Sequence, residues 1–231
     1  LPVFCLVLAM FLWASSFIAL KVAFLDYHPM VVIFGRMAVA SIAFLFLLPR
    51  FRNIRIRRQD WKLLALMALS EPCLYFIFEA LALKNTTASQ ASVITTMLPL
   101  LVTVASAIFL AEKFSLKNLL GLFLAMAGGI GLSLTGAATE HAPAPLLGNF
   151  YEFLAMVCAT AYTISVKSLT SRYPALFLTA VQAWVGALFF GPLLAMPQIP
   201  LPESLLLMPV SAIIYLGLAV TLVAYGCYNY A

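Results

Sequence analysis

Residues 8–21 read LAMFLWASSFIALK, and a similar stretch, LAMVCATAYTISVK, returns at residues 154–167. The two stretches share Leu, Ala, Met, Ile and Lys at the same offsets, 146 residues apart, and the pairing continues to Tyr27 and Tyr173. This repeat predicts that the chain is built from two homologous halves.

The composition indicates a membrane protein. Of the 231 residues, 65% are hydrophobic and only 9% are charged, whereas a soluble domain carries about 25% charged residues. The mean hydropathy is +1.07. The apolar runs have the length of about 20 residues that spans a bilayer as a helix, and they lack the alternating segments of an outer-membrane barrel. We therefore expect an all-α integral membrane protein.

Eight apolar runs are predicted to be transmembrane helices. Pro72, Pro99 and Pro192 fall inside them, where each proline frees a backbone carbonyl that neighbours or water must satisfy. Because the chain begins and ends in apolar residues, we interpret it as a fragment of a longer protein. The predicted spans are residues 2–24, 29–49, 61–83, 88–111, 116–136, 146–168, 174–196 and 207–231.

The positions of Lys and Arg predict the orientation. Ten of the 13 lie in one set of alternate connections, and six of these crowd between Arg50 and Lys62. The positive-inside rule makes this set cytoplasmic and puts the amino terminus in the cytoplasm. The remaining four are Lys113, Lys117, Lys167 and Arg172.

Two further conclusions follow from this orientation. If each repeat has five spans, an odd number, the halves must have inverted topology, an architecture that recurs in secondary transporters. The net charge of +5 then reflects topology, and a nucleic-acid partner is not needed to explain it. We expect Arg50 to Lys62 to rest on anionic headgroups, with about 1 kcal/mol from each base near the surface.

The segment from Ala80 to Ser115, ALALKNTTASQASVITTMLPLLVTVASAIFLAEKFS, resembles the EamA family of the drug/metabolite transporter superfamily. The family pattern there is an Ala-Leu pair, a helix entry rich in Thr and Ser, a central proline and a closing glutamate. A Trp-small-x-x-Phe motif in the first span adds to the resemblance, although Ala14 stands where the family usually has glycine. The matching residues are Ala82, Leu83, Thr87, Ser89, Pro99, Glu112, Trp13, Phe17 and Arg36.

The resemblance implies ten spans in two five-helix repeats. It divides this chain into a first repeat at residues 1–136, an external linker at 137–145 and a second repeat at 146–231 that stops after its third helix. The family also implies a multi-pass protein of a cell membrane, with the bacterial inner membrane as the expected location. By the same resemblance, we expect efflux of small organic solutes such as amino acids or metabolites, by alternating access around a midplane cavity.

Arg36, Glu71 and Glu79 are charged residues inside predicted spans, where an unpaired charge costs at least a few kcal/mol. Arg36 and Glu79 are within reach of each other, so one reading is an ion pair that only joins the second and third helices. The other reading places Arg36 or Glu71 on the solute path. Glu71 is the better candidate, because it lies near midplane, beside Pro72, and it could carry a proton if its surroundings are apolar.

Aromatic and polar residues at similar depth complete the predicted binding site. Trp13 and Ser16 share one face of the first helix, and the repeat offset brings Tyr162 to the matching place in the sixth. With Tyr75 and Gln182, these side chains suit a small organic ligand. No pattern predicts a cofactor or a metal site; His28 and His141 are isolated histidines in loops.

Two other classes of protein stay open. A membrane-embedded enzyme would need a nucleophile with a base, or a metal cluster, and neither HExxH nor GxSxG occurs in the sequence, so we expect no enzyme. A membrane assembly or receptor subunit that transports nothing would have a similar composition. Small residues recur every fourth position at Gly121, Ala125, Gly129 and Ser133, which would let a helix of this chain, or of a second copy in a homodimer, pack closely.

Overall fold

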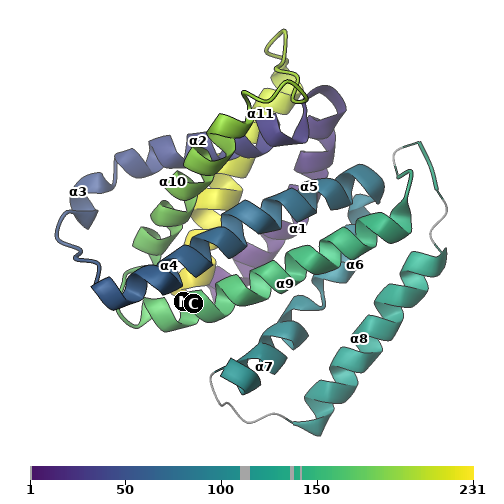
Figure 1. The fold of residues 1–231 in the computed structure, drawn as a ribbon, viewed down its shortest axis with the longest axis horizontal. Helices are drawn as coiled ribbons and strands as arrows, with labels where there is room; N and C mark the ends of the chain where they lie inside the picture. The colour runs from purple at the N-terminus through teal and green to yellow at the C-terminus, as the bar shows by residue number, and fades with distance from the viewer. Residues whose placement is uncertain (1, 110–114, 136–137, 141) are drawn as a thin grey trace.

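The computed structural model describes every residue except 1, 110–114, 136–137 and 141, and its fold is all-α (Figure 1). Within the described residues, six helical segments are long and apolar enough to cross a membrane, and two shorter apolar helices accompany them. These eight segments correspond to the eight predicted spans. The predicted all-α membrane class is confirmed. The six are Pro2–Asp26, Arg58–Asn85, Ala88–Phe109, Pro145–Thr170, Ala175–Leu193 and Leu207–Tyr230; the two shorter are Pro29–Leu45 and Leu116–Gly131.

Several spans are divided into shorter elements. The third and eighth spans each contain a wider π-helical segment, η2 and η3, between two α-helical parts, and the fourth span breaks before Pro99. In order, the elements are α1 (Pro2–Asp26), α2 (Pro29–Leu45), α3 (Leu48–Phe51), η1 (Arg58–Asp60), α4 (Trp61–Ala68), η2 (Leu69–Leu74), α5 (Tyr75–Asn85), α6 (Ala88–Thr95), α7 (Leu98–Phe109), α8 (Leu116–Thr135), α9 (Pro145–Thr170), α10 (Ala175–Leu193), α11 (Leu207–Tyr215), η3 (Leu216–Ala224) and α12 (Tyr225–Tyr230).

The two halves of the chain pack by exchanging their third helices. The helix α1 packs along α11, η3 and α12, whereas α9, its counterpart in the repeat, packs along α4, η2 and α5. In the same way α2 packs on η3 and α10 packs on η2, and α2 and α10 contact each other. Figure 1 shows α5 and α9 side by side, with α7 and α8 at one edge of the bundle. A two-fold relation between the halves predicts such an exchange; the axis itself stays a prediction.

The first of two corresponding tyrosine contacts lies between α1 and α2. Tyr27 is buried, and its hydroxyl donates to the carbonyl of Ser204 at 2.9 Å and accepts from the amide N–H of Leu206, also at 2.9 Å. Ser204 and Leu206 belong to the loop that leads into α11. This contact therefore joins the first half of the chain to the loop before the eighth span.

The second contact is the counterpart of the first at Tyr173, between α9 and α10. Its hydroxyl donates to Asp60 Oδ2 at 2.7 Å and accepts from the amide N–H of Arg57 at 3.0 Å. Asp60 is also paired with Arg172, whose Nη1 lies 3.0 Å from Oδ1. Tyr27 and Tyr173, which the repeat aligned, thus make the same kind of bond to the loop before the third helix of the other half.

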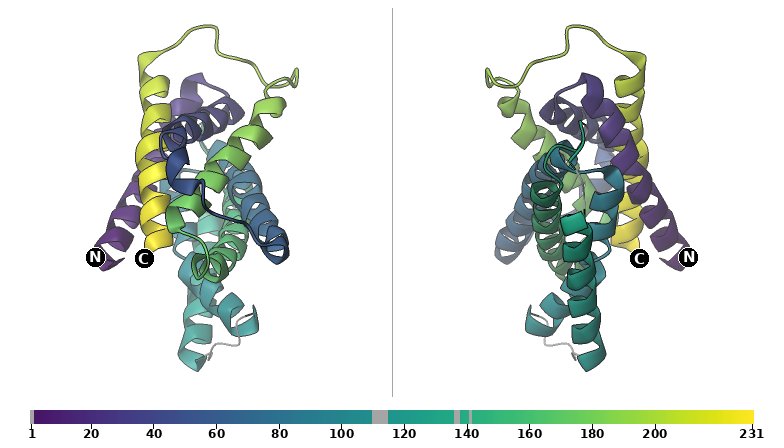
Figure 2. Two further views of the ribbon diagram at one scale, coloured as in Figure 1. Left: turned by 90° about the vertical axis from the view of Figure 1, so that its left-hand side faces the viewer. Right: turned by 90° about the vertical axis from the view of Figure 1, so that its right-hand side faces the viewer.

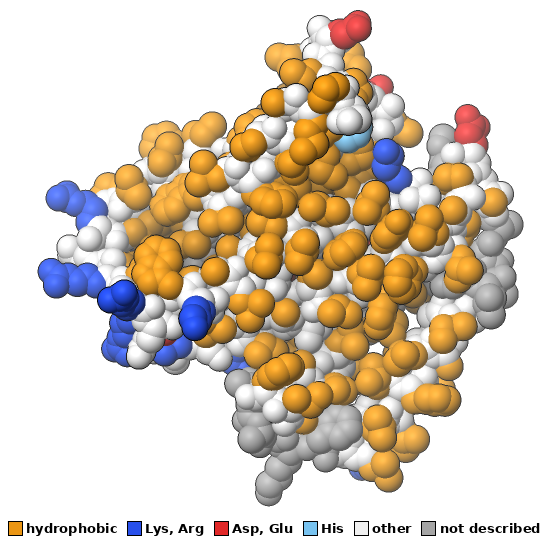
Figure 3. Space-filling view, in the orientation of Figure 1, with side chains coloured by type: hydrophobic (Ala, Val, Ile, Leu, Met, Phe, Trp, Pro, Cys, Tyr) orange, Lys and Arg blue, Asp and Glu red, His pale blue; other side chains and the backbone are white. Residues whose placement is uncertain are grey.

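Charge is distributed unevenly along the molecule. Figure 3 shows a cluster of Lys and Arg at the end where α3 and the start of α4 lie, with a broad hydrophobic surface over the helices next to it. Both chain termini lie at one end of the bundle, and the α1–α2 turn and the loop before α11 lie at the other (Figure 2). The cytoplasmic amino terminus and the lipid contact of Arg50 to Lys62 stay predictions. Glu112, Lys113 and His141 lie outside the described residues.

Candidate functional site

A small cavity lies where the two halves of the chain meet. Its volume is about 40 Å³, room for only a few water molecules. Helices from both halves form its wall, which consists of Trp13, Ser16, Phe17, Arg36, Glu71, Tyr75, Phe76, Glu79, Thr95, Leu98, Met156, Ala159, Tyr162, Thr163, Val220, Tyr225 and Tyr228. A groove of about 640 Å³ between α4, α7 and α9 has no charged side chain among its described lining residues, and one of about 410 Å³ at Lys21, Lys84 and Glu140 lies at the ends of α1 and α5. The small cavity is the candidate site, because its wall carries charged groups that are buried inside the spans.

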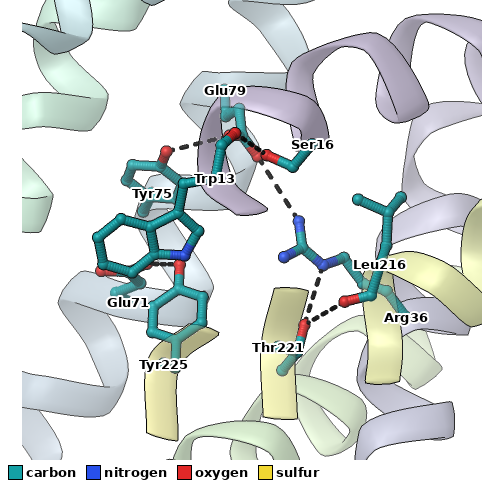
Figure 4. Close-up of polar contacts among 9 residues, drawn as sticks. All are labelled: Trp13, Ser16, Arg36, Glu71, Tyr75, Glu79, Leu216, Thr221 and Tyr225. Carbon is teal, nitrogen blue, oxygen red and sulfur yellow. Dashed lines mark hydrogen bonds and ion pairs between the residues drawn. The ribbon is translucent and has the colours of Figure 1, made fainter. Parts of the chain in front are cut away.

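Arg36 on α2 supplies the positive charge of this cavity. Its side chain is 2% exposed, and Nη1 lies 3.9 Å from Glu79 Oε2 on α5 (Figure 4). Its Nε donates to Thr221 Oγ1 at 3.2 Å, and its guanidinium carbon lies 4.4 Å from the ring centroid of Phe76. Glu79 in turn accepts from the Tyr75 hydroxyl at 3.0 Å. Arg36 is therefore held by an ion pair, a hydrogen bond and a cation–π contact, as a buried charge requires.

The close approach of η3 to α2 explains how Thr221 reaches Arg36. A Cβ added to Gly217 would lie 2.7 Å from Val39 Cβ and 2.9 Å from the carbonyl oxygen of Arg36. Only glycine leaves room for this contact between the two elements. Thr221 also donates to the Leu216 carbonyl five residues earlier, at 2.9 Å, which satisfies a carbonyl within the π-helical segment.

Glu71 faces the cavity from η2, in the third span. Glu71 has extended backbone angles (φ −146°, ψ 118°), and Pro72 lacks an N–H, so the helix is interrupted here. The buried Glu71 carboxyl accepts a hydrogen bond from the hydroxyl of Tyr225 on α12 (Figure 4). The Trp13 ring packs on Tyr225, with centroids 5.0 Å apart, and the buried Trp13 Nε1 has no hydrogen-bond partner in the part of the chain that the structure describes. Trp13 therefore offers a free donor beside a carboxyl group.

The sixth helix contributes to the cavity as the repeat predicted, with one correction. Ala159 and Tyr162 on α9, which correspond to Trp13 and Ser16, both line the cavity. Gln182 does not: it is fully buried behind Tyr162, whose hydroxyl lies 3.1 Å from Gln182 Oε1 and 3.0 Å from Asn229 Oδ1. The expectation that Gln182 faces the cavity was wrong, because Tyr162 is longer and occupies the space in front of it.

The structure therefore brings together Trp13, Ser16, Glu71, Tyr75 and Tyr162, with Arg36 and Glu79 in the same wall. Sequence reasoning missed Glu152, which is fully buried on α9 and 3.2 Å from Thr95 Oγ1. The signal was present, since Glu152 is a carboxylic acid inside an apolar run. No group of three or more His, Cys, Asp or Glu side chains that could hold a metal ion occurs among the described residues.

Comparisons with known proteins agree with the resemblance in the sequence. The profile of the EamA-like transporter family matches residues 1–134 and 146–231. An uncharacterized transporter of Archaeoglobus fulgidus is 27% identical, over 98% of this chain and 78% of its own length. A probable terminal-alkyne amino-acid exporter of Streptantibioticus cattleyicolor is 25% identical, over 99% of this chain and 75% of its own length.

A solved crystal structure shares the fold. It has a TM-score of 0.66 and 18% sequence identity, and the match covers 99% of this chain and 78% of that one. At this identity the match supports the fold alone. The agreement extends over almost the whole chain, so it includes the helices from both halves that line the cavity.

Proposed function

Because the chain belongs to the EamA-like transporter family, we propose that it exports amino acids or related zwitterionic metabolites. The chain is a multi-pass membrane protein of a transporter family, and the helices that line the cavity come from both of its halves. The observation that carries the proposal is the charge of the cavity wall, which holds the Arg36 guanidinium together with the carboxyl groups of Glu71 and Glu79.

The two signs of charge suit a ligand that carries both. An amino acid has a carboxylate, which a guanidinium binds well, and an ammonium group, which a carboxylate binds. Glu71 would take the ammonium group and Arg36 the carboxylate, while the indole N–H of Trp13 could donate to a further ligand oxygen. Tyr75, Tyr162 and Ser16 would enclose the rest of the solute.

The size of the cavity requires a change of shape during transport. At roughly 10–15 Å³ for each water molecule, about 40 Å³ holds only about three waters, so the cavity is too small for even the smallest amino acid. In this conformation Tyr27 and Tyr173 are hydrogen-bonded to residues just before the third helix of the other half, at opposite ends of the bundle. Opening one end while the other stays closed is alternating access between two related halves, and it is part of the proposal.

The name of one relative supports the direction of transport. The Streptantibioticus protein is named as a probable exporter of an amino acid, and its match covers 99% of this chain. The proposal also includes the two inverted repeats at 1–136 and 146–231, location in the inner membrane with a cytoplasmic amino terminus, and coupling to protons.

A ligand-stabilisation screen of the purified protein tests the substrate class. Neutral amino acids are compared with matched amines that lack the carboxylate and matched acids that lack the ammonium group. The proposal expects a rise in unfolding temperature with amino acids only, because each single-charge analogue leaves a buried charge of the wall unmatched. Equal stabilisation by the amines, or by the acids, would contradict a site for zwitterions.

A further inference from the structure

Glu152 is a buried carboxyl group that the proposed solute site does not use. It lies on α9 about seven residues from the start of the helix, roughly 10 Å along it at 1.5 Å per residue. The side chain is fully buried, and Oε2 has no hydrogen-bond partner among the described residues. Oε1 has one neighbour, the hydroxyl of Thr95 on α6, at 3.2 Å. An ionised carboxylate with so few donors would be very costly at this depth.

The hydroxyl of Thr95 shows which protonation state fits. Its Oγ1 lies 3.0 Å from the Ala91 carbonyl and 3.2 Å from Glu152 Oε1. A hydroxyl has one proton to donate, and a carbonyl oxygen can only accept. If Thr95 donates to Ala91, the contact with Glu152 is a hydrogen bond only when the carboxyl group carries a proton and donates it to Oγ1. With an ionised Glu152, one of the two contacts would join two acceptors.

The surrounding charges point the same way. Among the described residues, the membrane-spanning segments bury four carboxyl groups but one guanidinium, that of Arg36. Asp60, at the end of the third span, is paired with Arg172, so three carboxyl groups remain deeper in the bundle, those of Glu71, Glu79 and Glu152. In this conformation Arg36 is paired with Glu79. Full ionisation would therefore leave two uncompensated negative charges in the bundle.

The titratable groups on the elements packed against α9 do not supply a cation for Glu152. The helix α5 carries Glu79, which is itself an acid, and Tyr75, with Lys84 at its exposed end. The segment η2 carries Glu71 and Cys73; α6, α7 and α10 carry no titratable side chain. Two of the remaining titratable side chains lie near helix ends, Lys62 on α4 and Lys117 on α8. The others are on α12: Tyr225, Cys227, Tyr228 and Tyr230.

We propose that Glu152 is a proton-binding site, occupied in this conformation and linked to the central cavity through the Thr95 hydroxyl. Thr95 lines the cavity whereas Glu152 does not, so the hydroxyl stands between the proton site and the solute site. A proton that leaves Glu152 passes to Thr95 Oγ1 as that hydroxyl turns from the Ala91 carbonyl and gives its own proton to a water molecule in the cavity, which carries it away as hydronium. The cavity has room for a few water molecules. The site is separate from Arg36 and Glu71, and it does not depend on which solute is carried.

Infrared difference spectroscopy tests the site on the purified full chain without any solute. The carbonyl stretch of a protonated carboxylic acid is distinct from the bands of a carboxylate. At neutral pH we expect the spectrum of the unmodified protein minus that of Glu152→Gln to contain one protonated acid per chain. The matched control is Glu140→Gln, which removes an exposed glutamate and should leave the protonated-acid bands unchanged.

A second variant keeps the test decisive if Glu152→Gln does not fold. Thr95→Val keeps the shape of the side chain but removes the hydroxyl, so the carbonyl band of Glu152 should shift as its hydrogen-bond partner is lost. A difference spectrum with carboxylate bands only, or a protonated-acid region unchanged by Thr95→Val, would overturn the proposal. Because no solute is present, either result leaves the proposed export function to be judged by its own experiment.

Discussion

The Arg36 to Glu79 pair gives the prediction with the largest effect on stability. In Arg36→Met the carboxylate of Glu79 stays buried with only the Tyr75 hydroxyl as a partner. Breaking one side of a buried pair costs about 3–5 kcal/mol in the free energy of unfolding. The contact of the guanidinium with Phe76 is lost as well, which adds up to about 2 kcal/mol.

The matching substitution Glu79→Gln should cost less. The amide oxygen of glutamine can still accept from Tyr75, and Arg36 keeps its contacts with Thr221 and Phe76. We expect a loss of about 1–3 kcal/mol, the cost of leaving one buried polar group short of a partner. The double variant no longer contains an unpaired charge, so it should be more stable than the sum of the single losses predicts, by about 0.5–3 kcal/mol.

Thermal unfolding in one detergent at one protein concentration measures this cycle. At about 2–4 °C per kcal/mol, a total loss of about 3–7 kcal/mol in Arg36→Met should lower the unfolding temperature by roughly 6–28 °C. Lys84→Met is the control, because it removes a cation from the exposed end of α5 and should change stability by less than about 0.5 kcal/mol. Strictly additive losses in the double variant would refute the reasoning that the buried charges stabilise each other.

Three further predictions follow from the ends of the helices. Tyr173→Phe should lower the unfolding temperature more than Tyr27→Phe. The hydroxyl of Tyr173 donates to a carboxylate, a bond worth about 1.5–3 kcal/mol, whereas that of Tyr27 donates to a backbone carbonyl, a bond worth about 0.5–1.5 kcal/mol. Equal shifts in the two variants would contradict this. Partial burial, and then the charge of Lys84, lower the pKa of His28, whose Nδ1 accepts from the amide N–H of Met30 at the start of α2. The contribution of neutral His28 to stability is therefore complete above about pH 6.5 and is lost as the pH falls toward the lowered pKa. His28→Asn should remove this acid sensitivity from melting curves. A cysteine at the exposed position Asn53, in a cysteine-free background, should resist an impermeant thiol reagent added outside intact cells, and ready labelling would reverse the orientation.

The sequence predicted those parts of the site that follow from depth in the bilayer and from the need to pair buried charges. A buried guanidinium needs a carboxylate at similar depth, and depth can be counted along a helix, so the pairing of Arg36 with Glu79 was within reach. The internal repeat aligns positions of one half with positions of the other. Tyr162 corresponds to Ser16 in this alignment, and both line the cavity wall.

The rotation of each helix could not be predicted in the same way. Gln182 has a depth similar to that of Tyr162, but it lies behind that ring rather than beside it. The π-helical segments change the direction in which later side chains point, and this is why the bond between Tyr225 and Glu71 was not foreseen. Glu152 is different, because the rule that singled out Glu71 applies to it equally and was not applied.

Counterflow of a labelled neutral amino acid into vesicles that contain the purified protein tests the central claim most directly. Rates are compared for the unmodified protein, Glu71→Gln and Glu79→Gln at equal amounts of folded protein. If Glu71 binds the ammonium group, losing its charge should cost about 1.5–3 kcal/mol and lower the rate roughly 10-fold to 150-fold. Glu79→Gln should act through stability and stay within about threefold per folded molecule. A silent Glu71→Gln, with transport equal to that of the unmodified protein, would contradict a solute path through this cavity.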